Sequence, residues 1–193
     1  MAIVIALVVV GCSQQKKAAP APAPTPIANL NTDAMEVPRI EFCKLVPGSA
    51  VTDALGGRPQ SDSSYGNGDV SDVGGGVRDV VHEIGCSWTG KDGATARAWV
   101  FAQPVDVSFA RRVVASNERT KGCRAVGGAA YGKPTTTQLC RFPDGTVRIR
   151  HAGLISSTWL TCELGGTAAD ESVLRTRADR WCVEVVNALN TAK

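Results

Sequence analysis

Seven cysteines carry most of the reactive chemistry in this chain of 193 residues. Six of them follow residue 39, and an even number of cysteines in an exported protein is typical of disulfides. None belongs to a Cys-x-x-Cys pair or to a Cys/His cluster of the kind that holds zinc, so the pattern indicates neither a metal site nor a cofactor. Of the many possible pairings we favour sequence order: Cys43 with Cys86, Cys123 with Cys140, and Cys162 with Cys182.

The seventh cysteine, Cys12, follows Gly11 and an apolar run of nine residues, Ala2 to Val10. Such a run fits the core of a signal peptide, whereas a membrane-spanning helix needs ~20 residues. Because Val9-Val10-Gly11-Cys12 looks like a bacterial lipobox, we predict a signal peptide over residues 1–11 and acylation of Cys12, for example by palmitate. Two or more acyl chains would anchor the protein to the extracytoplasmic face of the cell membrane.

Two alternatives to this anchor stay open. Met1-Ala2 lacks the basic residue that usually precedes a signal-peptide core, so either the start lies upstream or the segment is not exported. The apolar run would otherwise be a short buried strand with a Gly-Cys pair at its end. Detergent partitioning of a Cys12→Ala variant separates these cases.

Histidine is the usual general base, and the chain has two, His82 and His151. Both lie in predicted strands, no Gly-x-Ser-x-Gly elbow accompanies them, and Ser87 is in mid-strand beside a cysteine that we expect to be bridged. We therefore predict structural roles for both histidines and no enzymatic activity. The alternative is a secreted hydrolase, which would need a deep pocket at one of them.

Two glycine-rich segments resemble ligand loops. Gly127 to Pro134 approaches a phosphate loop, but Pro134 stands where the magnesium-binding Ser or Thr is required, so we reject nucleotide binding. Ser61 to Asp79 carries four aspartates among glycines, yet it departs from the EF-hand pattern. We predict a mobile surface loop there instead of a calcium site.

Charge is unevenly distributed along the chain, although the formal net charge is only +3. Residues 119–151 contain seven basic residues against one acid, while residues 53–92 contain three basic residues against seven acids. The small net charge and the lack of clusters exclude a nucleic-acid partner in our interpretation. Partners must instead be sought in local patches.

Arg148 and Arg150 form the most specific of these patches, because alternation along a strand places both on one face. Arginine pairs bind carboxylate or phosphate through two-pronged hydrogen bonds. Together with Arg141 they are our candidate binding site for an anionic envelope component, such as a phospholipid head group or an acidic glycan. The competing interpretation is a solvated sheet face whose arginines pair with acids elsewhere.

The chain divides into three parts, of which the predicted signal peptide over residues 1–11 is the first. Residues 12–38 form a lipidated N-terminus and a tether rich in Pro and Ala, a composition that cannot bury a core. Residues 39–193 form one disulfide-bonded domain of ordinary size.

Within that domain, alternating helical and strand patterns predict class α+β. Helices are expected from Pro47 to Gly56, from 107 to 119 with Asp106 or Ser108 as N-cap and Phe109, Val113 and Val114 buried, and after Thr167 to the C-terminus. Strands are expected over 80–89, 94–103, 135–142, 146–152 and 154–164, the first two joined by a tight turn at Gly90 to Gly93. These short connections predict an antiparallel sheet of about five strands, with the C-terminal amphipathic helix and two shorter helices packed on it.

Several short motifs resemble secreted actinobacterial lipoproteins built on a domain of unknown function. They are Phe42-Cys43-Lys44-Leu45 before a helix ending Ala54-Leu55-Gly56, then Gly85-Cys86-Ser87-Trp88, Gly127-Gly128-Ala129-Ala130-Tyr131, and the last helix. The resemblance covers most of residues 40–190. It implies a cell-envelope lipoprotein with a Cys43–Cys86 bridge, and it brings no activity with it. We therefore expect a noncatalytic module that binds a ligand, an anionic envelope component or an envelope protein.

Overall fold

The computed structural model describes residues 25–74, 76–127, 131–167 and 170–192. Within them the chain forms a seven-stranded antiparallel sheet, more than the five strands expected, in the order β1-β4-β5-β9-β8-β7-β6. The α+β class is confirmed. The strands are β1 (Ser61–Tyr65), β4 (Glu83–Thr89), β5 (Thr95–Phe101), β6 (Cys123–Ala125), β7 (Thr135–Arg141), β8 (Val147–Ile155) and β9 (Thr158–Gly166). The helices are α1 (Gly48–Leu55), α2 (Val107–Asn117) and α3 (Glu171–Asn190), with 3-10 turns η1 (Ile27–Asn29), η2 (Thr32–Ala34) and η3 (Lys91–Gly93).

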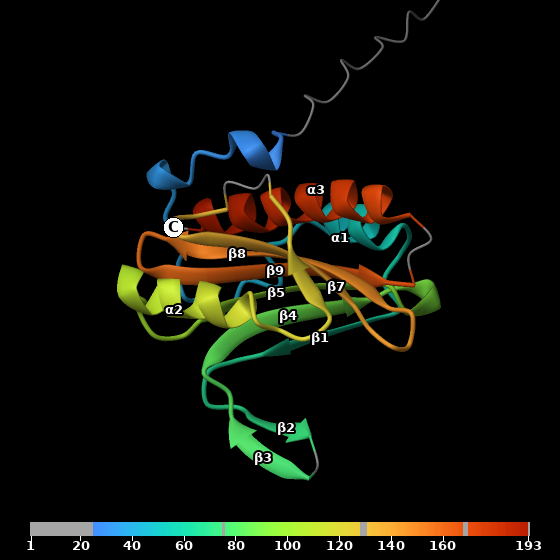
Figure 1. The fold of residues 1–193 in the computed structure, drawn as a ribbon, viewed down its shortest axis with the longest axis horizontal. Helices are drawn as coiled ribbons and strands as arrows, with labels where there is room; N and C mark the ends of the chain where they lie inside the picture. Colours follow the sequence, from blue (N-terminus) through green and yellow to red (C-terminus); the bar gives the residue numbers. More distant parts are fainter. Residues whose placement is uncertain (1–24, 75, 128–130, 168–169, 193) are drawn as a thin grey trace, which may run out of the picture.

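Helices cover the two faces of the sheet unequally (Figure 1). α3 and α1 lie on one face, and α2 lies on part of the other. On the first face, the Trp181 ring of α3 packs edge-on against Trp88 with ring centres 5.4 Å apart, and its Nε1 donates to the Arg97 carbonyl at 3.2 Å. Burying one such large side chain stabilises the fold by about 1.5–3 kcal/mol. No described helix is both long and apolar enough to span a membrane.

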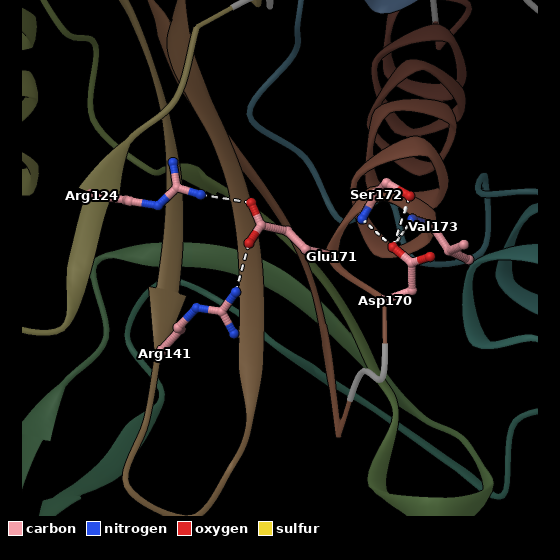
Figure 2. Close-up of polar contacts among 6 residues, drawn as sticks. All are labelled: Arg124, Arg141, Asp170, Glu171, Ser172 and Val173. Atoms are coloured by element: carbon pink, nitrogen blue, oxygen red, sulfur yellow. Dashed lines mark hydrogen bonds and ion pairs between the residues drawn. The ribbon is translucent and has the colours of Figure 1, made fainter.

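Helix α3 begins later than the sequence pattern predicts. Its N-cap is Asp170, whose carboxylate accepts from the Ser172 and Val173 amides at 2.8 and 3.4 Å, whereas we expected Thr167 to cap it. Figure 2 shows these contacts. A carboxylate is as good a cap as a hydroxyl and adds negative charge at the positive end of the helix.

Helix α2 begins at the first of its two predicted caps, since Asp106 accepts from the Phe109 amide at 2.7 Å. The expected burial of Phe109 is wrong: its side chain is 41% exposed, and Ala110 is fully buried in its place. Helical spacing explains the shift, because Ala110, Val113 and Val114 share one face. Phe109 lies at the margin of that face and contacts the Phe101 ring.

The hairpin of β8 and β9 turns at Ser156–Ser157, not at Gly153 as predicted. Gly153 lies inside β8 because the Tyr131 carbonyl oxygen occupies the space that a Cβ would need. Ser156 adopts a φ of 55° at the turn. A glycine that suggests a turn in the sequence is thus required here by a close backbone approach.

Residues 61–79 are not the loop that we predicted. They form β1, at one edge of the main sheet, and the hairpin of β2 (Val70–Gly74) and β3 (Val77–Val80). Hydrogen bonds from the Gly68 amide to the Val81 carbonyl and from the Val81 amide to the Asp69 carbonyl, at 2.9 and 2.8 Å, close the base of this hairpin. We call residues 66–82 the arm, which extends from the β1–β4 end of the sheet (Figure 1).

The folded domain begins earlier than residue 39. Ile27, Leu30 and Val37 are buried in the main core, and the Val37 carbonyl accepts from Thr158 Oγ1 at 2.7 Å. Arg39 donates to the Ser157 carbonyl and hydroxyl and to Thr158. The predicted tether is therefore too long, because the apolar residues at its C-terminal end are buried in the core of the domain. Cys12, the predicted signal peptide and the rest of the predicted tether lie outside the described residues.

The disulfides of the described chain are Cys43–Cys86, Cys123–Cys140 and Cys162–Cys182, the pairing by sequence order that we favoured. Cys123 and Cys140 are register partners on β6 and β7. The other two bridges tie covering segments to the sheet: Cys43 before α1 to β4, and Cys182 of α3 to β9.

Candidate functional site

The three arginines of the predicted anion site lie on different faces of the sheet. Arg148 and Arg150 share the face opposite α3, whereas Arg141 pairs in register with Val147 and so lies on the α3 side. There Arg141 and Arg124 each approach a separate oxygen of Glu171 at 2.6 Å, as Figure 2 shows. Arg141 thus neutralises the acidic first turn of α3 and does not belong to the site.

Arg148 and Arg150 belong to a larger polar surface on the part of the sheet that α2 leaves open. We call it the arginine face. A separate hollow of about 550 Å³ lies near Arg39 and is not part of this face. The hollow in the arginine face has a volume of about 470 Å³. It is lined by Ser63 and Tyr65 of β1, Glu83, Cys86 and Ser87 of β4, Arg97 and Trp99 of β5, and Arg150 of β8.

Glu163 lies at the centre of the arginine face, and only 2% of its side chain is exposed. Arg150 donates to Glu163 Oε2 from Nε at 2.9 Å and from Nη2 at 2.6 Å. On the other side of β9, Arg97 is the register partner of Glu163 in β5. A buried charge needs such a partner, and this one is surrounded by more cations than it can neutralise.

Two of these arginines keep hydrogen-bond donors available. The Nε of Arg148 is buried, lies 3.9 Å from Glu163 Oε1 and has no hydrogen-bond acceptor among the described residues, while 32% of the Arg148 side chain is exposed. Its guanidinium lies over the Phe142 ring, 4.4 Å from the centre. Arg97 is exposed, and no carboxylate in the described part of the chain forms an ion pair with it. The competing interpretation, in which these arginines pair with acids elsewhere, holds for Arg141 and Arg150 and in part for Arg148, whose only ion pair within the described ranges is the 3.9 Å approach to Glu163. Arg97, which the sequence patterns did not single out, is the cation without such a partner in the described chain.

Two glycines allow long side chains to lie across neighbouring strands. A Cβ at Gly165 of β9 would lie 3.0 Å from Arg148 Cγ, and a Cβ at Gly85 of β4 would overlap the Tyr65 ring. These bare positions let Arg148 extend over β9 and Tyr65 over β4. The floor of the arginine face thus includes the Tyr65 ring and the Arg148 side chain, each lying over a glycine of the neighbouring strand.

Tyr65 and Glu83 form the polar boundary of this floor, with 3.5 Å between Tyr65 Oη and Glu83 Oε2. Burial raises the pKa of Tyr65, and the neighbouring Glu83 carboxylate raises it further. Burial also raises the pKa of Glu83, against the opposing effects of the Tyr65 hydroxyl and the Arg150 charge. Tyr65 therefore remains a neutral hydrogen-bond donor at physiological pH, and Glu83 takes up a proton more readily than an exposed glutamate.

The two histidines occupy dissimilar places. His151 lies in β8, as predicted, and is buried beneath α3 with Nδ1 3.0 Å from Thr137 Oγ1 and Nε2 2.9 Å from Asp179 Oδ1. His82 is exposed and precedes β4, so its predicted strand position is wrong. It lines a second hollow of about 710 Å³, the arm hollow, with Tyr65, Asp69, Val70, Ser71, Asp79, Val80, Val81 and Glu83.

The glycine-rich segment near Pro134 packs between other elements, although its residues 128–130 lie outside the described chain. Lys133, the lysine of the phosphate-loop pattern, is 2.5 Å from Asp33 of η2. Its backbone amide donates to Leu154 of β8. Lys133 thus attaches the N-terminal segment to the domain.

Sequence reasoning missed Arg97, Trp99 and Glu163. The first two share a face of a correctly predicted strand, and that alternation was a usable signal. Nothing local shows that β5 and β8 flank the same strand, β9, which brings Arg97, Glu163 and Arg150 into one row.

Comparison with known proteins identifies no family. No family model matches the chain, and no curated protein matches it. Among solved structures, the extracellular domain of PknH from Mycobacterium tuberculosis is similar, with a TM-score of 0.45 and 13% identity over 77% of this chain and 96% of that one. A similarity of this size does not establish a common fold or function.

Proposed function

We propose that this protein is an extracytoplasmic, noncatalytic binding module that holds an anionic group on its arginine face. One observation carries the proposal: Arg97, Arg148 and Arg150 surround the buried carboxylate of Glu163, and Arg97 and Arg150 line a solvent-open hollow beside it. The arginines exceed the charge of Glu163, and Arg97 and Arg148 have donors to spare. A carboxylate or a phosphate accepts hydrogen bonds from guanidinium groups in a geometry that no neutral group matches.

The remaining residues of the hollow suit a polar ligand with hydroxyl groups. Ser63, Ser87 and Tyr65 supply hydroxyls, and the Trp99 ring lies beneath the Arg150 guanidinium, 5.4 Å from it. Pockets of a few hundred Å³ with a few placed polar groups are typical of small-ligand sites. Anionic envelope material, such as a phospholipid head group or an acidic sugar, meets these requirements.

The proposed location rests on the cysteines. Disulfides persist in oxidising compartments, and the bridges described above would not be maintained in a reducing cytoplasm. Acylation of Cys12 would then hold the domain at the extracytoplasmic face of the cell membrane. Because packing already begins at Ile27, the spacer between Cys12 and the domain is shorter than the sequence suggested.

A secreted hydrolase remains the alternative, and His82 is its best candidate base because it lines the arm hollow with Asp79 and Glu83. Binding is the better supported function, since the arginine face offers free donors for an anion. If a panel of ester and glycosidic substrates were hydrolysed by the protein and not by a His82→Ala variant, the enzymatic alternative would replace our proposal.

Calorimetric titration with glycerol 3-phosphate and with glucuronate tests the anion site. The double variant Arg97→Gln/Arg148→Gln should lose about tenfold or more in affinity, because charge-assisted hydrogen bonds contribute about 1.5–3 kcal/mol each. Arg111→Gln/Arg112→Gln removes the same charge from the exposed surface of α2 and is the matched control. Equal losses in both variants, or no binding by the unmodified protein, would reject the site.

A further inference from the structure

The arginine face does not end at the edge of its hollow. Tyr65 and Glu83 line both that hollow and the arm hollow, so the two cavities meet at these side chains. The arm extends beyond the β1–β4 end of the sheet, as Figure 1 shows, and its hollow is the larger of the two. An extended ligand seated on the arginines can therefore continue past Tyr65 to the arm.

The two ends of this continuous surface differ in chemistry. Val70 and Val80 are register partners across the β2–β3 hairpin, line the arm hollow and are 54% and 44% exposed. Exposed β-branched side chains on a two-stranded hairpin are not needed for the core, and such a hairpin has little stability of its own. The arm thus offers an apolar wall at the end that lacks arginines.

Acidic groups surround this apolar wall. Asp69 accepts from the Gly66 amide and Asp79 from the Val80 amide, each at 2.7 Å, so both carboxylates are held by the backbone. Glu83 lies between the two hollows. Their negative potential disfavours an anion at the arm and favours it at the arginines, which fixes the direction in which a ligand can lie.

From this polarity we infer that the two hollows form one site for an anionic amphiphile. Its charged head binds Arg97 and Arg148, and its apolar chain packs on Val70 and Val80. The inference rests on the proposed function and adds the class of ligand. A polyanionic glycan fits less well, because its repeated charges would lie against Asp69, Asp79 and Glu83.

The test compares dihexanoyl phosphatidic acid, kept monomeric, with glycerol 3-phosphate, which has the same charged group and no chains. Titrations use the full-length protein with Cys12→Ala, whose own acyl chains cannot compete. We expect the lipid to bind about tenfold more tightly than glycerol 3-phosphate, because part of each chain leaves water. Val70→Asn/Val80→Asn should cancel most of this advantage and leave glycerol 3-phosphate binding unchanged.

Val77→Asn is the matched control, since Val77 is 59% exposed on the same hairpin and does not line the arm hollow. Dihexanoyl phosphatidylcholine, whose head is zwitterionic, should bind more weakly than phosphatidic acid. If glycerol 3-phosphate and the lipid bind equally well, or if Val77→Asn acts like the double variant, the amphiphile is wrong and the anion site stands. Binding of polyglucuronate that the valine variants leave unaffected would assign the site to acidic glycans. Absence of binding by every anion would reject both proposals.

Discussion

Glu163 Oε2 accepts two hydrogen bonds from Arg150, at 2.9 Å from Nε and 2.6 Å from Nη2, in the middle strand of the row that joins β5, β9 and β8. This contact occupies Arg150 with the buried carboxylate, whereas Arg148 approaches the same carboxylate only to 3.9 Å and Arg97 forms no ion pair in the described chain. The same residue therefore stabilises the sheet and determines which cations face solvent.

Glu163→Leu should lower the free energy of unfolding by about 2–3 kcal/mol. Removing one member of a buried pair costs ~3–5 kcal/mol, and partial exposure of Arg150 reduces that cost. Urea unfolding provides the measurement, with Glu163→Gln as the control that retains an acceptor and should lose less. Equal stability of Glu163→Leu and the unmodified protein would contradict this account of the pair.

The stability of the protein should depend on pH through Glu83. Since burial raises the pKa of Glu83 in the folded state, the unfolded chain releases this proton first as the pH rises. Stability from this group is therefore present below the ordinary glutamate pKa of about 4.3 and is lost as pH rises through the higher folded pKa. Glu83→Gln should gain stability relative to the unmodified protein between acid and neutral pH. A difference that stays constant across paired urea titrations would disprove the linkage.

The Cys162–Cys182 bridge should contribute more to stability than the Cys123–Cys140 bridge. The two close sequence separations of similar length, 20 and 17 residues, so each constrains the unfolded chain by about 3 kcal/mol. Cys162 and Cys182 are in addition completely buried between β9 and α3. We expect Cys162→Ala/Cys182→Ala to unfold at lower urea concentration than Cys123→Ala/Cys140→Ala, and the reverse order would show that packing at this bridge matters little.

The N-terminal segment should behave as part of the domain. A chain that begins at Arg39 loses the buried side chains of Ile27, Leu30 and Val37, each contributing about 1.5–3 kcal/mol when fully packed. It should unfold at a clearly lower temperature than a chain that begins at Thr25. Circular dichroism measures both, and identical transitions would restore the longer tether of the sequence interpretation.

Cys12 should determine membrane association. On detergent phase separation, the wild-type protein with acylated Cys12 is expected in the detergent phase and the Cys12→Ala variant in the aqueous phase, because acyl chains supply most of the membrane affinity. The rest of the chain is unchanged in this variant. The same partitioning for both proteins would remove the lipid anchor while leaving the binding site untouched.

Local patterns in the sequence predicted much of the framework. The strands around Cys86, Ala98, Cys140 and Cys162, the last helix and the disulfide pairing follow from alternation, helical spacing and sequence order. These predictions succeed because the spacing of apolar residues in a buried element shows which of its faces is buried. The sequences of the arm and β1 have no such pattern, since side chains exposed on both faces need no apolar alternation.

The candidate site shows the same division. The sequence alone placed Arg148 and Arg150 on one face, because a strand has a period of two residues. Only the tertiary structure separated Arg141 from them, added Arg97 and Glu163, and joined Tyr65 to Glu83 at the boundary of the arm. Strand order is decided by pairings between residues far apart in the chain. For that reason the local sequence determined which face of the sheet each side chain lies on, whereas the tertiary structure determined which other side chains lie beside it.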